Sequence, residues 1–279
     1  MTDDASASAV QAFYDDHDTD EWERLATGID GRLEFESTTR ALESHLPETA
    51  RVLDAGAGAG RYAIWLAEHG YEVTALDLSR EQVALAREQV RRRGLADRIS
   101  VVQGSITDLS LPASAFDATC CLGGVLSHVL DEQARERAVE ELRRVTRSGG
   151  PVAVSVLGRL GTIQLYLAAG YQLEALPALF EHGDYDAETL ERYGYEPAFA
   201  PAHLFRRAEL RSLLAERGLS VRTVRGLEGL GSVFHRDPIR ETLAGDDATL
   251  AGIRETVATT NDDPTVADLS VHMLAVGTA

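Results

Sequence analysis

Strand-like and helix-like segments alternate along most of residues 51–157 of this 279-residue chain. Short apolar runs bounded by small or polar residues are typical of buried strands, and apolar residues at every third or fourth position are typical of helices. The predicted strands are 51–53, 71–76, 99–103, 116–122 and 151–157, and the predicted helices are 61–69, 81–93 and 132–145. Such alternation produces a parallel sheet covered by helices on both faces, so we expect a doubly wound α/β fold.

The segments on either side of this core have other patterns. Residues 8–46 have the spacing of two or three helices, and a stretch rich in Leu, Tyr and Ala (162–201) interrupts the alternation. The later elements are predicted as helices over 207–217 and 248–259 and strands over 219–226 and 269–276. We expect one domain made of a helical cap (1–47), a central core (51–157), an insert (158–205) and the C-terminal part of the core (206–279). Because the insert follows the carboxyl end of a strand, where open α/β sheets bind ligands, we expect it to act as a lid over the substrate.

Composition limits the environment and the partners. The chain has 45 acidic against 27 basic residues, a net charge of −18, and every basic residue is Arg because Lys is absent. This balance is typical of proteins adapted to high salt, and it argues against nucleic acid as a partner because phosphate contacts need clustered cations. The chain shows neither a secretory signal nor an apolar run near the ~18 residues of a bilayer span, so we expect a soluble cytoplasmic protein without membrane contact. The adjacent Cys120 and Cys121 are interpreted as buried thiols on opposite faces of a strand.

Three glycines alternate just after the first strand, at Gly56, Gly58 and Gly60. A dinucleotide loop has the spacing Gly-x-Gly-x-x-Gly, so this spacing disfavours a nicotinamide cofactor. Asp54 precedes the glycines, where its charge attracts an amine and repels a pyrophosphate, and the following helix N-terminus offers N–H groups to a carboxylate. Asp77 ends the next strand, where a carboxylate can accept hydrogen bonds from both ribose hydroxyls. The loop therefore predicts a ligand with an amine, a carboxylate and a ribose.

These residues resemble the motifs of the class I S-adenosylmethionine-dependent methyltransferases. The first motif matches Asp54-Ala55-Gly56-Ala57-Gly58-Ala59-Gly60-Arg61, and the second matches Asp77-Leu78-Ser79. Three further matches follow in order at Gln103-Gly104-Ser105-Ile106, Phe116-Asp117-Ala118 and residues 142–150. The resemblance implies a Rossmann-like sheet of seven strands, mostly parallel, with an antiparallel last strand that residues 270–276 fit.

The resemblance also implies the cofactor S-adenosyl-L-methionine, with S-adenosyl-L-homocysteine as product, and a set of binding residues. These are Tyr14, Arg32, Asp54, Ala55, Gly56, Ala57, Gly58, Gly60, Asp77, Leu78, Gly104, Ser105, Ile106, Leu122 and Gly123. Tyr14 and Arg32, together with Trp22, are expected to close over the methionine end. The family often has an acidic residue at the position of Ser105, so the adenine amino group is expected to bond Ser105 or Asp108.

Methyl transfer from a sulfonium is a direct displacement, which requires alignment of the nucleophile and exclusion of water more than a dedicated base. His128, six residues after Leu122, is the candidate catalytic residue, because an imidazole can accept a proton near neutral pH or hold a substrate. A purely structural role for His128 is the alternative. No metal site is expected, since His182, Asp184 and Asp186 lack ligand spacing and are interpreted as a solvated surface.

A small molecule is the expected acceptor, with O-, N- or C-methylation left open. The chain has no Asn-Pro-Pro-Tyr or Asp-Pro-Pro-Tyr motif and no Pro-Cys pair, which disfavours adenine, glutamine and cytosine C5 as acceptors. The aromatic and aliphatic side chains of the insert are suited to an apolar or aromatic metabolite, including a quinone precursor. The alternatives are an RNA or protein methyltransferase, a nicotinamide-linked oxidoreductase, and a protein that binds the nucleoside without turnover. The sequence leaves the oligomeric state open.

Overall fold

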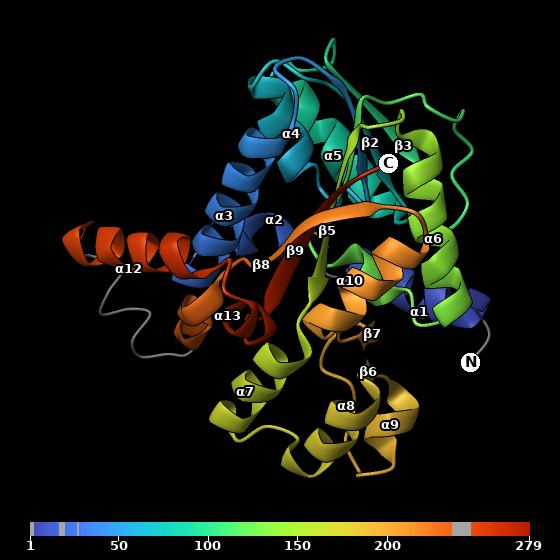
Figure 1. Ribbon diagram of the computed structural model, residues 1–279. Helices are drawn as coiled ribbons and strands as arrows, with labels where there is room; N and C mark the ends of the chain where they lie inside the picture. The colour runs from blue at the N-terminus through green and yellow to red at the C-terminus, as the bar shows by residue number, and fades with distance from the viewer. Residues whose placement is uncertain (1–2, 17–19, 27, 236–246) are drawn as a thin grey trace.

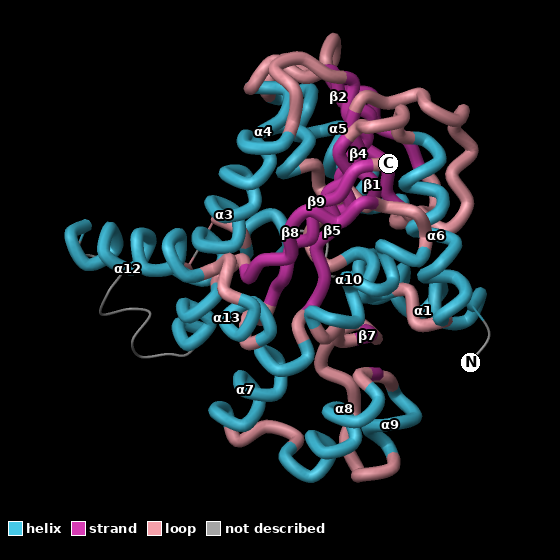
Figure 2. The backbone as a smooth tube through the Cα atoms, viewed as in Figure 1, coloured by secondary structure: helices cyan, strands magenta, loops and turns pink. Residues whose placement is uncertain are grey.

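A computed structural model of the chain describes residues 3–16, 20–26, 28–235 and 247–279. Its centre is a seven-stranded sheet with the order β3-β2-β1-β4-β5-β9-β8 (Figures 1 and 2). The strands are β1 Arg51–Ala55, β2 Glu72–Asp77, β3 Ile99–Gln103, β4 Ala118–Cys121, β5 Pro151–Leu157, β8 Ser220–Gly226 and β9 His272–Thr278. Strands β1 to β5 pair in parallel, and β9 runs antiparallel between β5 and β8. The predicted doubly wound sheet with its antiparallel last strand is confirmed.

Helices cover both faces of the sheet. The helices of the core are α4 Arg61–Glu68, α5 Arg80–Arg92, α6 Glu132–Val145 and α10 Arg207–Glu216, with the short helix η1 Val125–His128 after β4. The cap is formed by α1 Asp3–Asp16, α2 Asp20–Arg24 and α3 Ile29–His45, and η3 Gly229–His235, α12 Asp247–Thr260 and α13 Pro264–Asp268 lie between β8 and β9. Each helix of the parallel core was predicted to within two residues at either end.

The two adjacent cysteines show how the sheet divides the core. Cys120 packs in one apolar cluster with Leu42 of α3 and Leu66 of α4, and Cys121 packs in the other with Leu142 of α6 and Leu210 of α10. Both thiols are fully buried, and burial raises the pKa of each. Neighbouring strand residues point to opposite faces, so the prediction for this pair is confirmed.

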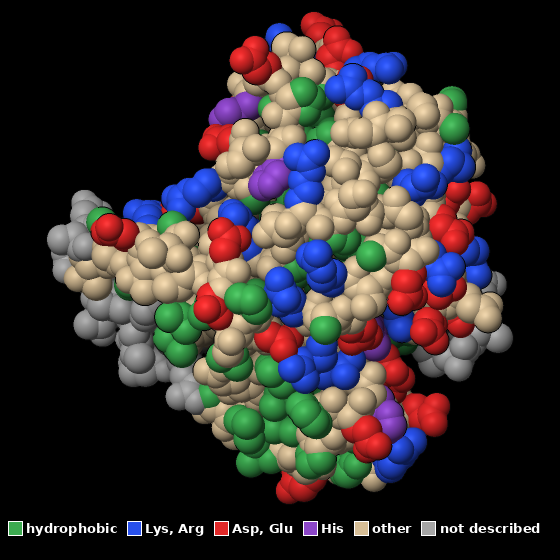
Figure 3. Space-filling model, viewed as in Figure 1, with side chains coloured by type: hydrophobic (Ala, Val, Ile, Leu, Met, Phe, Trp, Pro, Cys, Tyr) green, Lys and Arg blue, Asp and Glu red, His purple; other side chains and the backbone are tan. Residues whose placement is uncertain are grey.

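The insert forms a lobe beyond the end of β5, in the lower part of Figure 1. It contains α7 Arg159–Ala169, η2 Leu173–Ala175, α8 Leu176–His182 and α9 Ala187–Glu191, with the two-stranded sheet β6 Asp184–Tyr185 and β7 Ala202–His203. Figure 3 shows hydrophobic side chains gathered on the surface of this lobe. The exposed members in the insert are Leu167, Tyr171, Leu173, Phe180 and Tyr193. Two-residue strands are too short to produce an alternating pattern, so this small sheet was not predicted.

The structure departs most from the predicted strand bounds at β4, which is shorter than 116–122, and at β9, which lies two to three residues beyond 269–276. β4 ends at Cys121 because Gly123 and Gly124 turn the chain with φ of +70° and +82°, which only glycine adopts readily. β9 begins at His272, since Leu269 caps the short helix α13. None of the described helices combines the length and the apolar character that crossing a bilayer requires.

Candidate functional site

A cleft opens where β1, β2, β3 and β4 end, which is the edge that binds ligands in doubly wound sheets. The loops after these strands form its floor, and α1, α2 and η1 supply other parts of its wall. The cleft brings together most of the predicted cofactor residues. Those in its wall are Tyr14, Gly56, Ala57, Gly58, Asp77, Leu78, Gly104, Ser105, Ile106, Leu122 and Gly123.

The glycine loop has a backbone that other residues would strain. Gly56, Gly58 and Gly60 have φ of +81°, +52° and +88°. A Cβ on Gly56 would lie 2.4 Å from Cγ2 of Val125, so this position also needs the absence of a side chain. Gly60 is not in the wall of the cleft, because it turns the chain into α4 and packs toward Ala86 of α5.

Asp77 joins the glycine loop to the next strand. Its Oδ2 accepts a hydrogen bond of 2.7 Å from the Gly58 N–H, and its Oδ1 accepts one of 2.9 Å from the Ser79 N–H. These two bonds from backbone N–H groups fix the orientation of the carboxylate. Asp77 is therefore a fixed acceptor in the wall of the cleft.

Asp54 lies behind the wall instead of in it. The side chain is buried, and neither carboxylate oxygen has a hydrogen-bond partner among the residues that the structure describes. Burial, and secondly the negative charge of Asp77, raise the pKa of Asp54 from 3.8 to about 7. A positive charge bound in the cleft would favour its ionised form. Asp54 can thus attract the amine of a ligand only across the wall, without direct contact. Ala55 is fully buried in β1 and also makes no part of the wall.

The far side of the cleft carries two hydroxyl groups. Ser105 and Thr107 both line it, and their hydroxyl oxygens lie 2.8 Å apart. Asp108, the other predicted partner for adenine, is exposed and outside the wall. Thr107 was missed by the sequence reasoning, since a single threonine in a loop carries no recognisable signal.

The cap contributes Tyr14, Trp22 and Arg24 to the cleft. Arg32 was predicted to close over the methionine end of the cofactor, but it lies outside the wall of the cleft. This side chain is exposed on α3, with its Nε 3.4 Å from the Ala26 carbonyl oxygen, because the buried face of α3 is formed by neighbouring residues. Arg24 takes the place near the cleft that was expected for Arg32.

His128 stands at the inner end of the cleft and is buried. Its Nδ1 lies 2.9 Å from the carbonyl oxygen of Pro201, which can only accept, so Nδ1 carries a proton. Its Nε2 lies 2.9 Å from the hydroxyl of Tyr14. In the neutral ring Nε2 therefore accepts from Tyr14, and the two side chains form one polar unit that links η1, α1 and the end of the insert.

A second cavity adjoins the first beneath the insert. The two cavities share Tyr14, Arg24, Gly123 and His128. The insert contributes Thr162, Leu165, Tyr166, Tyr185, Phe199, Ala202 and Leu204 to its wall. The wall is thus largely apolar and aromatic, with polar groups at the junction and at Asp30 and His272.

Three buried residues near this cavity, Glu34, Glu228 and His272, have potential ligand atoms within 4.8 Å of one another. Proton donors already occupy these carboxylates. Arg24 donates to both oxygens of Glu34, and Ser270 and His272 donate to Glu228. The arrangement therefore fits a network of ion pairs better than a metal site.

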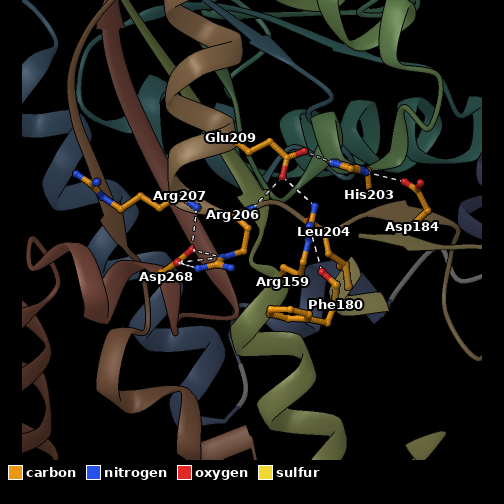
Figure 4. A network of polar contacts seen from close by, with 9 residues as sticks. All are labelled: Arg159, Phe180, Asp184, His203, Leu204, Arg206, Arg207, Glu209 and Asp268. Carbon is orange, nitrogen blue, oxygen red and sulfur yellow. Dashed lines mark hydrogen bonds and ion pairs between the residues drawn. The ribbon is translucent and has the colours of Figure 1, made fainter. Parts of the chain in front are cut away.

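Figure 4 shows a second polar network, which joins the insert to the core. His203 lies between two carboxylates, with Nδ1 2.6 Å from Asp184 Oδ1 and Nε2 2.5 Å from Glu209 Oε1. Arg159, at the start of α7, donates to Glu209 at 2.9 Å. The interpretation of Asp184 as part of a solvated surface is wrong, because it binds His203, whereas His182 is exposed as expected. The contact joins residues 19 positions apart, which no local pattern reveals.

Comparison with known proteins relates this geometry to one family. A family model described as a methyltransferase domain matches residues 52–150. The chain is 30% identical over 167 residues to methyltransferase GfsG of Streptomyces halstedii, covering 58% of this chain and 59% of that relative. It is 28% identical over 216 residues to a demethylmenaquinone methyltransferase of Porphyromonas gingivalis, covering 75% of this chain and 84% of the relative. The chain thus spans less than two thirds of the length of the first relative.

The fold is also similar to a solved structure. This is a SAM-dependent methyltransferase from Methanosarcina mazei, with a TM-score of 0.59 and 23% identity. The similarity covers 85% of this chain and 96% of that one. At this identity it concerns the fold, including regions outside residues 52–150.

Proposed function

Residues 52–150 of this chain belong to the class I S-adenosylmethionine-dependent methyltransferases, and on this premise we propose that the protein methylates a small molecule. The observation that carries the proposal is the pair of adjoining cavities. The first has the features of a nucleoside site, and the second is largely apolar and lined in part by the insert. Because they share Tyr14, Gly123 and His128, a donor in one and an acceptor in the other can meet at the junction.

The first cleft offers groups suited to each part of the cofactor. Asp77 places a carboxylate in the wall that suits the ribose hydroxyls, and Ser105 and Thr107 provide hydroxyls for the adenine end. Nothing lies within 4 Å of a Cβ built on Gly123, so a ligand can pass close against this backbone. The charge of Asp54 beneath the wall favours the positive ammonium and sulfonium groups.

The acceptor is proposed to occupy the second cavity, with the insert as its lid. Tyr166, Tyr185 and Phe199 supply flat apolar surfaces there, which suit an aromatic or aliphatic body. The relative from Porphyromonas gingivalis is, by its name, a demethylmenaquinone methyltransferase, and a quinone-type acceptor matches this wall. Enclosure by the insert would keep water away from the reacting groups.

S-adenosylmethionine, when bound, supplies an electrophilic methyl group. The residues of the chain have to orient the acceptor and remove its proton where it has one. His128 Nε2 holds a lone pair that the Tyr14 hydroxyl now occupies at 2.9 Å. We propose that an acceptor hydroxyl or amine at the junction passes its proton to this pair, while Pro201 keeps the imidazole in the required tautomer.

The cofactor half of the proposal is tested by calorimetry with S-adenosylmethionine and with NADH. We expect binding of the former only, and Asp77→Ala should weaken it by about 1 to 3 kcal/mol through the loss of charged hydrogen bonds. Asp117→Ala is a matched control. Asp117 is also an aspartate next to a strand of the sheet, directly before β4, but it makes no part of the cleft. Preferential binding of NADH would overturn the proposal.

The acceptor half is tested by replacing residues 164–197 with a short Gly/Ser linker, which leaves Phe199 and Pro201 beside His128. Formation of S-adenosylhomocysteine would be measured with panels of phenols, quinols and amines, and with tRNA and peptides for comparison. We expect turnover of a small molecule by the intact chain, and its loss in the variant with cofactor affinity within about tenfold, or ~1.4 kcal/mol. Turnover only of RNA or peptides would contradict the small-molecule assignment, and unchanged turnover in the variant would contradict the lid.

A further inference from the structure

One part of the wall of the second cavity is charged, although the rest is mainly apolar. Arg24, Asp30 and His272 line it there. They come from α2, from the start of α3 and from the first position of β9, so the antiparallel strand and the cap meet at this point. None of these residues was singled out in the sequence, and the methyl transfer proposed above does not use His272.

His272 is held in one orientation by a buried carboxylate. Its Nδ1 lies 2.5 Å from Glu228 Oε1, and its backbone N–H donates to Glu228 Oε2 at 2.9 Å. Ser270 donates to the same Oε2 at 2.8 Å. Glu34 adds a second carboxylate, 3.5 Å from Nδ1. Both glutamates are buried, so their carboxylates are shielded from solvent.

Two buried carboxylates beside Nδ1, Glu228 at 2.5 Å and Glu34 at 3.5 Å, favour the protonated form of His272, in which both ring nitrogens are hydrogen-bond donors. Burial lowers its pKa, but the nearby charges of Glu34 and Glu228 raise it by more, so the pKa lies above its usual value of 6.5. Nδ1 donates to Glu228, while Nε2 has no hydrogen bond to the residues that the structure describes. Since His272 lines the cavity, its Nε2–H is the ring group that remains for a ligand.

The charges around His272 largely cancel. Arg24 is paired with Glu34, at 2.5 and 3.2 Å, and His272 is paired with Glu228. Asp30 adds a further carboxyl group to the same part of the wall. A carboxylate or phosphate entering here would meet no uncompensated cation. An ammonium placed at His272 Nε2 would face an N–H group, which has no lone pair to offer, and could bind in this part of the wall only at Asp30.

We propose that His272 is a specificity-determining residue that recognises a neutral oxygen, the carbonyl of a ketone or quinone, on an acceptor with an aromatic or aliphatic body. This inference rests on the proposed function, because it assigns the second cavity to the acceptor. The carbonyl accepts a hydrogen bond from Nε2, and the apolar wall of the insert holds the body. The nucleophile of the same molecule is then directed toward the junction at Tyr14 and His128.

The proposal is tested on the full chain loaded with S-adenosylhomocysteine, using three phenols that differ only in the para group. These probes are 4-hydroxyacetophenone, 4-hydroxybenzoate and tyramine, which carry a ketone, a carboxylate and an ammonium. Binding would be measured by saturation-transfer NMR titration. We expect the ketone to bind at least about tenfold more tightly than the other two. Equal binding of all three, or tighter binding of the carboxylate or the amine, would overturn the proposal.

Variants connect this preference to His272. His272→Phe keeps an aromatic ring without a donor and should abolish the preference, whereas His272→Gln keeps an N–H donor and should retain part of it. His182→Phe is the matched control, since His182 is exposed on the insert and outside both cavities. A preference that survives in His272→Phe would contradict the assignment. If His272→Phe does not fold, ¹⁵N-histidine NMR of the wild type decides, because the ketone should shift the Nε2 signal that is missing from His272→Gln.

Binding of S-adenosylhomocysteine separates this proposal from the previous one. A chain that binds the nucleoside but shows no ketone preference retains the proposed methyltransferase function and loses only the role of His272. A chain that binds no nucleoside at all fails the first proposal, whatever the probes do.

Discussion

The charge of Asp54 lowers the stability of the cofactor-free chain and favours the binding of a positive ligand. Its pKa of about 7, raised by burial and then by Asp77, means that the folded chain binds this proton more tightly than the unfolded chain, where 3.8 applies. Its contribution to stability is therefore fully present below pH 3.8 and is lost as the pH rises to about 7. We expect Asp54→Asn to stabilise the cofactor-free chain by an amount that grows with pH and levels off above 7, at about 2 to 4 kcal/mol. Urea unfolding between pH 5 and pH 9 measures this, and a gain that does not depend on pH would contradict it.

The same carboxylate should make cofactor binding depend on pH. A cation in the cleft favours ionised Asp54, so the affinity for S-adenosylmethionine should rise between pH 6 and pH 8, with uptake of the cofactor releasing a proton. Calorimetry in two buffers of different ionisation enthalpy counts that proton. In Asp54→Asn the affinity should be lower and independent of pH over this range. Proton release that persists in the variant would assign it to another group.

His128 is expected to affect turnover more than binding. His128→Gln replaces the basic Nε2 that faces Tyr14 with an amide that cannot take up a proton near neutral pH, so kcat for the acceptor found in the screen should fall by about 10² to 10⁴-fold. The Kd for S-adenosylmethionine should remain within a few-fold, since the ring is only one of many groups in the wall. His69→Gln, at the exposed end of α4, is the matched control. Unchanged kcat would leave His128 only the structural role of holding Pro201.

At the scale of elements, His203 joins the insert to the core through two carboxylates, as Figure 4 shows. Burial lowers the pKa of His203, but hydrogen bonds to Asp184 of β6 and Glu209 of α10 raise it by more. Arg135 opposes the shift from the side of α6. The protonated ring donates to both partners, so its stabilising contribution is complete below pH 6.5 and is lost as the pH rises through the folded pKa.

We therefore expect the lobe around β6 and α8 to open more often at high pH. Hydrogen exchange of residues 176–190, corrected for the intrinsic rate, should increase between pH 6 and pH 9, while exchange in β1 and β4 should not. His203→Gln should remove this difference by making the exchange fast at both values. Exchange that does not depend on pH in the wild type would show that the ion pairs do not control the insert.

At the scale of the whole molecule, the net charge of −18 is the dominant electrostatic feature. Uncompensated carboxylates repel one another in dilute buffer, and the Debye length falls from about 10 Å at 0.1 M salt to about 3 Å at 1 M. We expect the melting temperature to rise with added potassium chloride, because screening relieves repulsion in the compact state. Thermal melts in dilute buffer and in molar salt measure the effect. An unchanged melting temperature would remove the interpretation of the chain as salt-adapted, and leave the methyltransferase assignment untouched.

Most of the sheet was predictable because its signals are local. Hydrophobic periodicity, the alternate glycines and an acidic residue at or near the end of a strand are each recognised within a short stretch of chain. These signals predicted the order of the elements and the position of the glycine loop. The same logic failed at Arg32, where an amphipathic helix allows several rotations about its axis and only packing selects one. It also failed at Asp184, whose partner His203 is brought close by a turn of the insert.

The fold class, the position of the glycine loop after β1 and the separation of Cys120 from Cys121 followed from the sequence alone, because each depends on neighbours along the chain. Three other features could be found only in the folded chain: Asp54 stands behind the wall of the cleft, Tyr14 meets His128 across 114 positions, and His272 lines the second cavity. These features depend on how the cap, the insert and the antiparallel strand pack against the sheet. Burial and charge pairing in that packing set the pKa of a group and determine which hydrogen bonds it donates, and no local sequence pattern carries that information.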